Sequence, residues 1–261
     1  MQVCAEKLIL YLHGDLYRRD LLGKRVPIAF SGGLDSTLVA KVCSTLTDTY
    51  CIVAGAEGST DMKNARASAK RIGLELVEVT IDEDDAVDGA KEVCRITGLK
   101  DPVTVSFELP TYFAMKSASE GWIVTGQGAD ELFGGYAKYE SMEREEFRRR
   151  RMEDLDKAMG EVDCAERAIA AALGKEIIKP FLCNRIIAFA MDLQLDSVYP
   201  DKVRKRVVRE ALKDLGLPEI AAMPKKAAQY GSGVSVMLSS AADKRGKSVR
   251  EMIENFAEGS N

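Results

Sequence analysis

Histidine is the scarcest chemically active residue of this sequence, because the 261 residues contain only His13. A catalytic group of the Ser-His-Asp or Cys-His kind would depend on that one side chain, and a zinc site with several histidines is excluded. The six cysteines contain no C-x-x-C pair, which excludes zinc-ribbon and thioredoxin-like motifs. Without a secretory signal, we expect reduced, partly buried thiols in a cytoplasmic protein.

Long hydrophobic runs are also missing: no window approaches about 18 uninterrupted apolar residues, so no transmembrane helix is expected. The 37 Lys and Arg against 41 Asp and Glu give a net charge of −4. This mild acidity argues against a dedicated nucleic-acid binder, although a local basic patch stays open. The run RRRR at residues 148–151 has balancing acids nearby, which favours a solvated helix face over an anion-binding patch.

The first half of the chain alternates between short apolar runs and helical patterns. Strands are predicted at residues 26–30, 49–54, 74–81 and 122–125. Helices are predicted between them, including one at residues 108–119 with Pro110 in its first turn. We expect an α/β fold: a Rossmann-like parallel sheet of about five strands with helices on both faces. One domain should span residues 1–261, with an α/β part at 1–135 and a mainly helical part at 136–261.

The string SGGLDS at residues 31–36 follows a predicted strand and opens a predicted helix. Gly32 and Gly33 let the backbone turn tightly and approach a ligand. Ser31 and Ser36 add hydroxyl groups, and the helix start presents free N–H groups, which together favour phosphate. Asp35 fits beside phosphates when Mg²⁺ lies between them. The Walker pattern is absent, which excludes a P-loop kinase or GTPase.

A second glycine-rich string, TGQGADELFGGY, occupies residues 125–136 directly after another predicted strand. Loops after the C-terminal ends of parallel strands share one edge of the sheet, where ligands bind. Asp35 and Asp130 can therefore converge, and two carboxylates with phosphate oxygens suit Mg²⁺. Each string alone also fits a glycine-rich turn with a helix cap, so the combination carries the prediction.

These residues resemble a known family. SGGLDS is similar to the signature (PP-loop) of the N-type ATP pyrophosphatases, and GQGADELFGGY resembles the synthetase domain of asparagine synthetases, with β-lactam synthetase as a relative. Further similar motifs follow in the family's order: DCA at 163–165, EIIKPFL at 176–182, a K-x-x-x-R-x-A pattern with a following Leu-Pro at 205–218, MPK at 223–225 and GSG at 231–233.

The resemblance implies a ligase of amino-acid biosynthesis that uses ATP and Mg²⁺. A substrate carboxylate would attack the α-phosphorus, pyrophosphate would leave, and ammonia or another amine would displace AMP. The matching residues that would bind ATP are Ser31, Gly32, Gly33, Asp35, Ser36, Gly126, Gln127 and Gly128. Asp35 and Asp130 would bind the metal. Lys225, with Lys226 as the alternative, would stabilise the transition state, and Glu176 would act near the reacting carbonyl.

The sequence also departs from the family pattern. No N-terminal glutaminase domain precedes the first loop, so we expect ammonia from solution, ammonia from a separate glutaminase subunit, or another amine. Gln127 stands where an acid or a tyrosine is usual, and Ile178 and Met223 replace arginines. These changes put aspartate in doubt as the substrate, because its second carboxylate needs cationic partners.

Two other functions stay open. One is an ATP pyrophosphatase with a different acceptor, like NAD synthetase, GMP synthetase or a tRNA-modifying enzyme. The other is an ATP-binding module without catalysis. Association into a homo-oligomer is left open as well.

Overall fold

The computed structural model describes residues 2–193, 198, 203–224 and 231–259. Its five-stranded sheet has the order β3-β2-β1-β4-β5, and the neighbouring strands pair in parallel. The strands are β1 (Arg25–Ala29), β2 (Asp48–Gly55), β3 (Glu75–Thr80), β4 (Trp122–Val124) and β5 (Glu176–Ile178). The predicted α/β fold with a parallel sheet is confirmed.

Strand β5 comes from the part of the chain that was predicted to be mainly helical. It is three residues long and pairs with β4, with Trp122 opposite Glu176 and Val124 opposite Ile178. Such a short apolar run has too few residues to show an alternating pattern, which is why the sequence does not reveal it. The first and second parts of the chain therefore contribute to one sheet.

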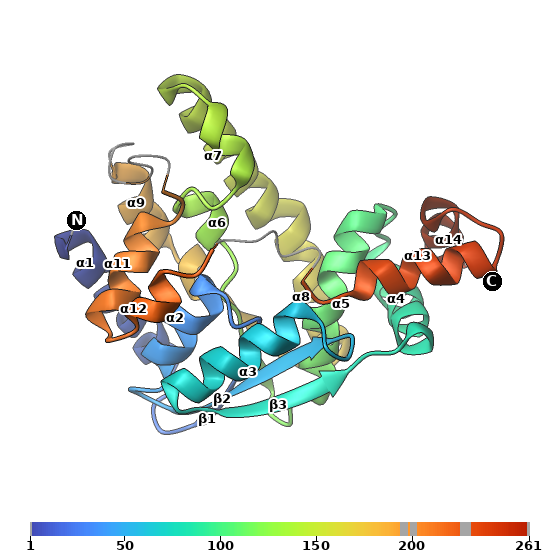
Figure 1. Cartoon of the computed structure of the whole chain (residues 1–261), viewed down its shortest axis with the longest axis horizontal. Helices are drawn as coiled ribbons and strands as arrows, with labels where there is room; N and C mark the ends of the chain where they lie inside the picture. Colours follow the sequence, from blue (N-terminus) through green and yellow to red (C-terminus); the bar gives the residue numbers. More distant parts are fainter. Residues whose placement is uncertain (1, 194–197, 199–202, 225–230, 260–261) are drawn as a thin grey trace.

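Helices connect and cover the strands (Figure 1). Those in the first part are α1 (Gln2–Arg18), α2 (Leu34–Cys43), α3 (Thr60–Ile72), α4 (Glu83–Thr97), α5 (Pro102–Ser117) and α6 (Ala129–Leu132). The second part contains η1 (Ala137–Ser141), α7 (Arg144–Lys157), the π-helix η2 (Ala158–Val162), α8 (Asp163–Ala172), η3 (Pro180–Leu182), α9 (Asn184–Asp192), α11 (Arg206–Asp214), α12 (Pro218–Ala221), α13 (Val234–Lys244) and α14 (Val249–Ala257).

Capping residues explain several helix ends. Ser59 accepts a hydrogen bond from Met62 N at the start of α3, and Gly73 ends that helix in the left-handed conformation. Helix α5 differs from the prediction because it begins at Pro102, after an Asp101 cap that accepts from Thr104 N. Pro110 therefore lies inside the helix and not in its first turn. The cap and Pro102 at the helix start were the signal that the prediction missed.

Alternating strand residues build a hydrophobic core on each face of the sheet. Ile28, Cys51 and Val53 point into a core that includes residues of α1, α2 and α11. Tyr50 and Ile52 point into the opposite core, with residues of α4, α5, α13 and α14. Figure 1 shows these two groups of helices at opposite ends of the molecule. The strands that lead into the two glycine-rich strings are thus held between two packed hydrophobic layers.

Helix α7 projects from the body of the molecule (Figure 1). Arg148, Arg149 and Arg150 are exposed and form ion pairs with glutamates of the same helix. Arg151 is the exception, because the residue is 4% exposed and its guanidinium donates to Ala190 O at 2.6 Å. The solvated face predicted for the run therefore holds for three of the four arginines.

The cysteines are unpaired throughout the described residues. Three are buried, Cys43, Cys51 and Cys94, and burial raises the pKa of Cys94 to about 11. Cys164 is the exposed one. None of the described helices is long and apolar enough to cross a membrane.

Candidate active site

The site lies where the strand order changes direction. The chain runs from β1 outward to β3 and then crosses back to β4, which is the other neighbour of β1. Open parallel sheets bind ligands at such a point, beside the C-terminal ends of the strands. Residues 31–36 follow β1 and residues 125–130 follow β4. The two predicted glycine-rich loops therefore meet at one edge of the sheet.

The first loop depends on Gly32, whose φ is 70°. A Cβ at this position would lie 2.4 Å from the backbone of Asn64 in α3, so only glycine fits. Ser68, also in α3, donates from Oγ to Gly32 O at 2.8 Å. Helix α2 then starts with Gly33 as its N-cap, and no described side chain caps it. Its first N–H groups therefore keep their capacity to bind an anion.

The second loop packs directly on the first. A Cβ on Gly126 would lie 2.8 Å from Ser36 N and 2.9 Å from the carbonyl carbon of Asp35. Gly128 has a φ of 90° and sits against Leu182, whose Cδ2 would lie 2.4 Å from an added Cβ. Glycine at 126 thus allows the backbones of the two loops to touch, and glycine at 128 leaves room for Leu182.

The ammonium group of Lys205 joins Asp35 to Asp130. Its Nζ lies 2.8 Å from Asp130 Oδ1 and donates a hydrogen bond to Asp35 Oδ2. The lysine side chain is 0% exposed, whereas the two aspartates keep 17% and 21% of their side chains exposed. Gly135 makes this possible, because a Cβ there would lie 2.4 Å from Lys205 Cε. Both expected metal ligands therefore reach one cation position.

Lys205 has an uncommon backbone conformation, with φ 58° and ψ 37°. Asp20 is the other described non-glycine residue with a positive φ. Lys205 is the N-cap of α11, and its carbonyl accepts from Arg209 N at 2.9 Å. It belongs to a motif recognised in the sequence, but no role was predicted for it. Its 170-residue separation from Asp35 left no local signal.

The GSG segment at residues 231–233 closes the other end of this edge. Ala56 N donates to Ser232 O at 2.8 Å, and Asp61 N donates to Gly231 O at 3.0 Å. A Cβ on Gly231 would lie 2.0 Å from Asp61 Oδ1, so glycine is required for this close packing. The segment thus lies against the loop between β2 and α3, at the C-terminal end of β2.

A buried charged cluster adjoins Gln127. The Lys179 ammonium, just after β5, contacts the Glu166 carboxylate and lies 2.8 Å from Asp163 Oδ1. The Gln127 side chain lies close enough to Glu166 to lower the pKa of its carboxyl group. Glu108 and Glu166 are each 0% exposed, and Lys179 is 4% exposed. Asp163 and Lys179 lie in motifs recognised in the sequence, but their contact with Glu108 and Glu166 was not predicted, because the members come from α5, α8 and the end of β5.

The cluster shifts the proton affinity of its carboxyl groups. Neither oxygen of Glu108 has a hydrogen-bond partner within the described ranges. Burial raises the pKa of Glu108 well above its usual value, and the negative charge of Glu166 raises it further. Burial also raises the pKa of Glu166, against the opposing effect of Lys179. The positive charge of Lys179 opposes the rise of the pKa at both carboxyl groups.

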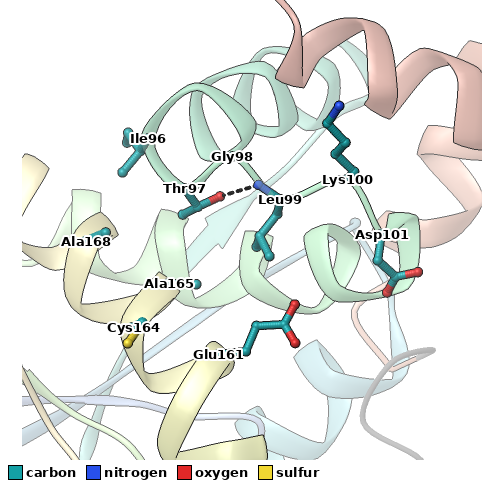
Figure 2. Close-up of a pocket in the computed structure, with 10 residues that line it drawn as sticks. All are labelled: Ile96, Thr97, Gly98, Leu99, Lys100, Asp101, Glu161, Cys164, Ala165 and Ala168. Carbon is teal, nitrogen blue, oxygen red and sulfur yellow. Dashed lines mark hydrogen bonds between the residues drawn. The ribbon is translucent and has the colours of Figure 1, made fainter.

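A separate pocket of about 490 Å³ lies between the α4–α5 connection and α8 (Figure 2). Lys100, Glu161 and Cys164 are among its lining residues, and no residue of the two glycine-rich loops lines it. In Figure 2, Lys100 points away from Glu161, so the charged groups do not converge on one centre. The functional residues are therefore expected at the two glycine-rich loops and not at this pocket.

A family comparison matches most of the chain. The asparagine synthase family matches residues 22–168 and, in a second segment, residues 141–256. These segments include both glycine-rich loops, Lys205 and the GSG segment. The chain belongs to the asparagine synthase family.

Two curated members of the asparagine synthase family illustrate the relationship. A putative glutamine-hydrolysing asparagine synthetase of Methanocaldococcus jannaschii is 28% identical over 269 aligned residues, covering 88% of this chain and 50% of the relative. A glutamine-hydrolysing asparagine synthetase of Lotus japonicus is 30% identical over 209 residues, covering 72% and 35%. The chain thus spans half or less of the length of these relatives. Among solved structures, NMN synthetase from Francisella tularensis aligns with 99% of this chain and 86% of its own, at a TM-score of 0.44 and 16% identity.

Of the residues assigned by resemblance to the asparagine synthase family, Glu176 lies away from the site, and Lys225 falls outside the described residues. Glu176 starts β5, so it lies at the opposite edge of the sheet from the loops. Its side chain is 64% exposed, and Arg19 Nη1 lies 3.6 Å from its carboxylate. Lys225 and its neighbour Lys226 lie outside the described residues. Ile178, where the family has an arginine, is 2% exposed and packs in the core.

Proposed function

We propose that this chain is an ATP-dependent ligase that adenylates a carboxylate, releases pyrophosphate, and transfers the acyl group to ammonia or another amine. The observation that carries the proposal is the convergence of Asp35 and Asp130 on one cation position, between two glycine-rich loops. Membership of the asparagine synthase family supports the same reaction class.

The first loop is the proposed phosphate site. Its support is the start of α2 without a side-chain cap, together with Ser31 and Ser36, whose hydroxyl oxygens lie 3.4 Å apart. Backbone N–H groups and hydroxyls at a helix N-terminus bind phosphate oxygens. In the proposed reaction, this loop holds the pyrophosphate as the substrate carboxylate takes its place on the α-phosphorus.

The donor set fits Mg²⁺. Two carboxylates reach one cation position, and the described part of the chain holds no cluster of three or more His, Cys, Asp or Glu that would suit another metal. Mg²⁺ is commonly held by one or two carboxylates together with substrate phosphates. When bound, it would neutralise the charge that develops on the phosphates. Asp35 and Asp130 are the residues that would hold it.

The loop between β2 and α3 is the proposed adenine side. Its backbone at Ala56 is joined to Ser232, and Asp61 is joined to Gly231. These contacts support a nucleotide lying across the C-terminal ends of β1 and β2, with its base near residues 53–55 and Asp61 and its phosphates at residues 31–36.

Two bonds form and two bonds break in the proposed reaction. A carboxylate oxygen forms a bond to the α-phosphorus as the bond to pyrophosphate breaks. The amine nitrogen then attacks the acyl carbon, the bond to AMP breaks, and the amine loses a proton to water. Lys225 is the proposed stabiliser of charge in these steps, with Lys226 as the alternative. Glu176 is left out of the proposal because of its position at the opposite edge.

The carboxylic acid and the amine are proposed in general terms. Gln127 is neutral and Ile178 is buried, so neither supplies the cationic partner that the second carboxylate of aspartate needs. We therefore propose a carboxylic acid without assigning aspartate, and ammonia that comes from solution or from a separate glutaminase subunit.

The test is an incubation with Mg·ATP, ammonium and a panel of amino acids, read for AMP, pyrophosphate and an amide product. We expect pyrophosphate release that requires a carboxylic acid and is lost in Asp35→Ala. Asp88→Asn on the exposed face of α4 is the control and should leave the reaction unchanged. ATP binding without pyrophosphate release for any acid would instead favour a non-catalytic ATP-binding module.

A further inference from the structure

We propose that Lys205 is a built-in counter-ion of the carboxylate pair, so that the protein binds a divalent cation only when the nucleotide arrives. This inference rests on the proposed ATP site and adds a positioning residue to it. In the nucleotide-free protein, Lys205 holds Asp35 and Asp130 together; with the nucleotide bound, it releases them to the metal.

The contacts of Lys205 support the first half of this inference. Its ammonium bridges Asp35 Oδ2 and Asp130 Oδ1. Its side chain is 0% exposed, whereas both carboxylates remain partly open to solvent. The lysine therefore approaches from the protein side, and the solvent side of the carboxylates stays accessible. A cation arriving from solvent meets two carboxylates whose charge is already half neutralised.

Electrostatic repulsion supports the second half of the inference, in which Lys205 releases the carboxylates to the metal when nucleotide is bound. A divalent cation between the two carboxylates would stand beside the Lys205 ammonium, and like charges at such a distance repel strongly in a poorly solvated site. Tight metal binding therefore requires the ammonium to turn away from at least one carboxylate. A buried ammonium needs another anionic partner before it can do so. The phosphates of ATP, bound at the neighbouring loop, would supply that partner.

The coupling between nucleotide binding and metal binding must be reciprocal. If bound phosphate draws Lys205 from the carboxylates and thereby strengthens metal binding, bound metal strengthens nucleotide binding by the same factor. Free Mg²⁺ alone would then leave the protein in its lysine-bridged state.

The backbone around Lys205 suggests that this placement is built into the fold. Its left-handed conformation is costly for a residue with a Cβ, and such strain persists where the surroundings impose it. Gly135 gives the side chain its path, since a Cβ there would lie 2.4 Å from Lys205 Cε and 1.6 Å from Asp130 Oδ1. Helix α11 packs against α1 and α2, which fixes the start from which the lysine extends.

The test measures Mn²⁺ binding, by electron paramagnetic resonance of the free ion, to the wild type and to Lys205→Met. Without nucleotide, we expect Lys205→Met to bind Mn²⁺ at least tenfold more tightly than the wild type. With a saturating non-hydrolysable ATP analogue, we expect wild-type affinity for Mn²⁺ to rise at least tenfold. Adding Asp35→Asn to Lys205→Met should remove the gain, which identifies the carboxylate pair as the binding site.

Equal nucleotide-free affinities of the wild type and Lys205→Met would overturn the proposal. Lys205→Gln is a second variant, in case the methionine protein does not fold without metal. If neither variant folds with or without Mn²⁺, the wild type decides: Mn²⁺ binding of equal strength with and without the analogue overturns the proposal. The nucleotide-free measurements do not depend on adenylation, so failure of the proposed reaction would be seen separately.

Discussion

Gly126 lies so close to Asp35 that a Cβ added to the glycine would stand 2.9 Å from the carbonyl carbon of the aspartate. This contact joins the loop after β4 to the start of α2. Because both partners are backbone, neither can rotate away as a side chain would. The distance between the two glycine-rich loops is therefore set by the absence of a side chain at residue 126.

Gly126→Ala should separate the loops and weaken ATP binding at least tenfold, or about 1.4 kcal/mol. Isothermal titration calorimetry with an ATP analogue and Mg²⁺ checks this. Gly121→Ala is the matched control, since a Cβ there meets nothing within 4 Å. Unchanged affinity in Gly126→Ala, with normal folding, would show that the loop contact does not shape the nucleotide site.

Asp130→Asn should reduce turnover more than nucleotide binding, because it disturbs the placement of the metal and leaves the phosphate loop intact. We expect turnover to fall about a hundredfold, roughly 2.7 kcal/mol in the activation barrier. Steady-state pyrophosphate release and analogue binding, measured on the same protein, separate the two effects. A loss of analogue affinity as large as the loss of turnover would count against this assignment.

Glu108→Gln should stabilise the protein at pH 8 by about 1–3 kcal/mol, since it removes a buried carboxyl whose charge is unfavourable there. The folded-state pKa of Glu108 is raised, so the folded protein binds more protons than the unfolded chain between the ordinary glutamate pKa and the raised value. The contribution of Glu108 to stability therefore falls as the pH increases through that window.

Urea unfolding of the wild type and Glu108→Gln at several pH values tests the sign. The free energy of unfolding of Glu108→Gln, relative to that of the wild type, should increase from pH 4 towards pH 8. Glu145→Gln, on the exposed face of α7, serves as the control. An advantage that stays constant with pH would mean that Glu108 does not change its protonation on unfolding.

Glutamine should not serve as nitrogen donor to this chain alone, whereas ammonium should. Hydrolysis of glutamine requires an activated nucleophile, and Cys4 with His13 would be the available pair. His13 Nε2 is instead 2.8 Å from Thr45 Oγ1, and burial lowers the pKa of its imidazole. Glutamate release from glutamine that is lost in Cys4→Ser would contradict this prediction.

Four of the strands could be predicted because hydrophobic runs, glycine-terminated helices and caps such as Ser59 are local signals. The ends of β1 and β2 agree with the prediction within one residue. The start of α5 and the strand β5 were missed, because tertiary pairing with β4 and a proline tolerated inside a helix override local patterns. One error moved a helix boundary and the other left out a strand, but the parallel type of the sheet was predicted correctly.

The candidate site also contains some residues that could be predicted from the sequence and others that could not. Asp35 and Asp130 could be predicted to converge, because parallel topology brings loops after neighbouring strands to one edge. Lys205 could not be assigned its contact, since only the packing of α11 brings it to these carboxylates. The partners Glu108, Glu166 and Lys179 likewise come together only through tertiary packing. Glu176 shows the opposite case, a motif residue that the strand direction carries to the far edge.

The GSG segment also bears on how the protein is made. The loops after β1 and β4 leave the ribosome well before residues 205 and 231–233, which complete the same edge of the sheet. A nascent chain can thus pair β1 with β2 and β3 while its nucleotide pocket is still unfinished. We expect ATP to bind only the completed polypeptide, so that ligand binding would slow its degradation without protecting truncated translation products.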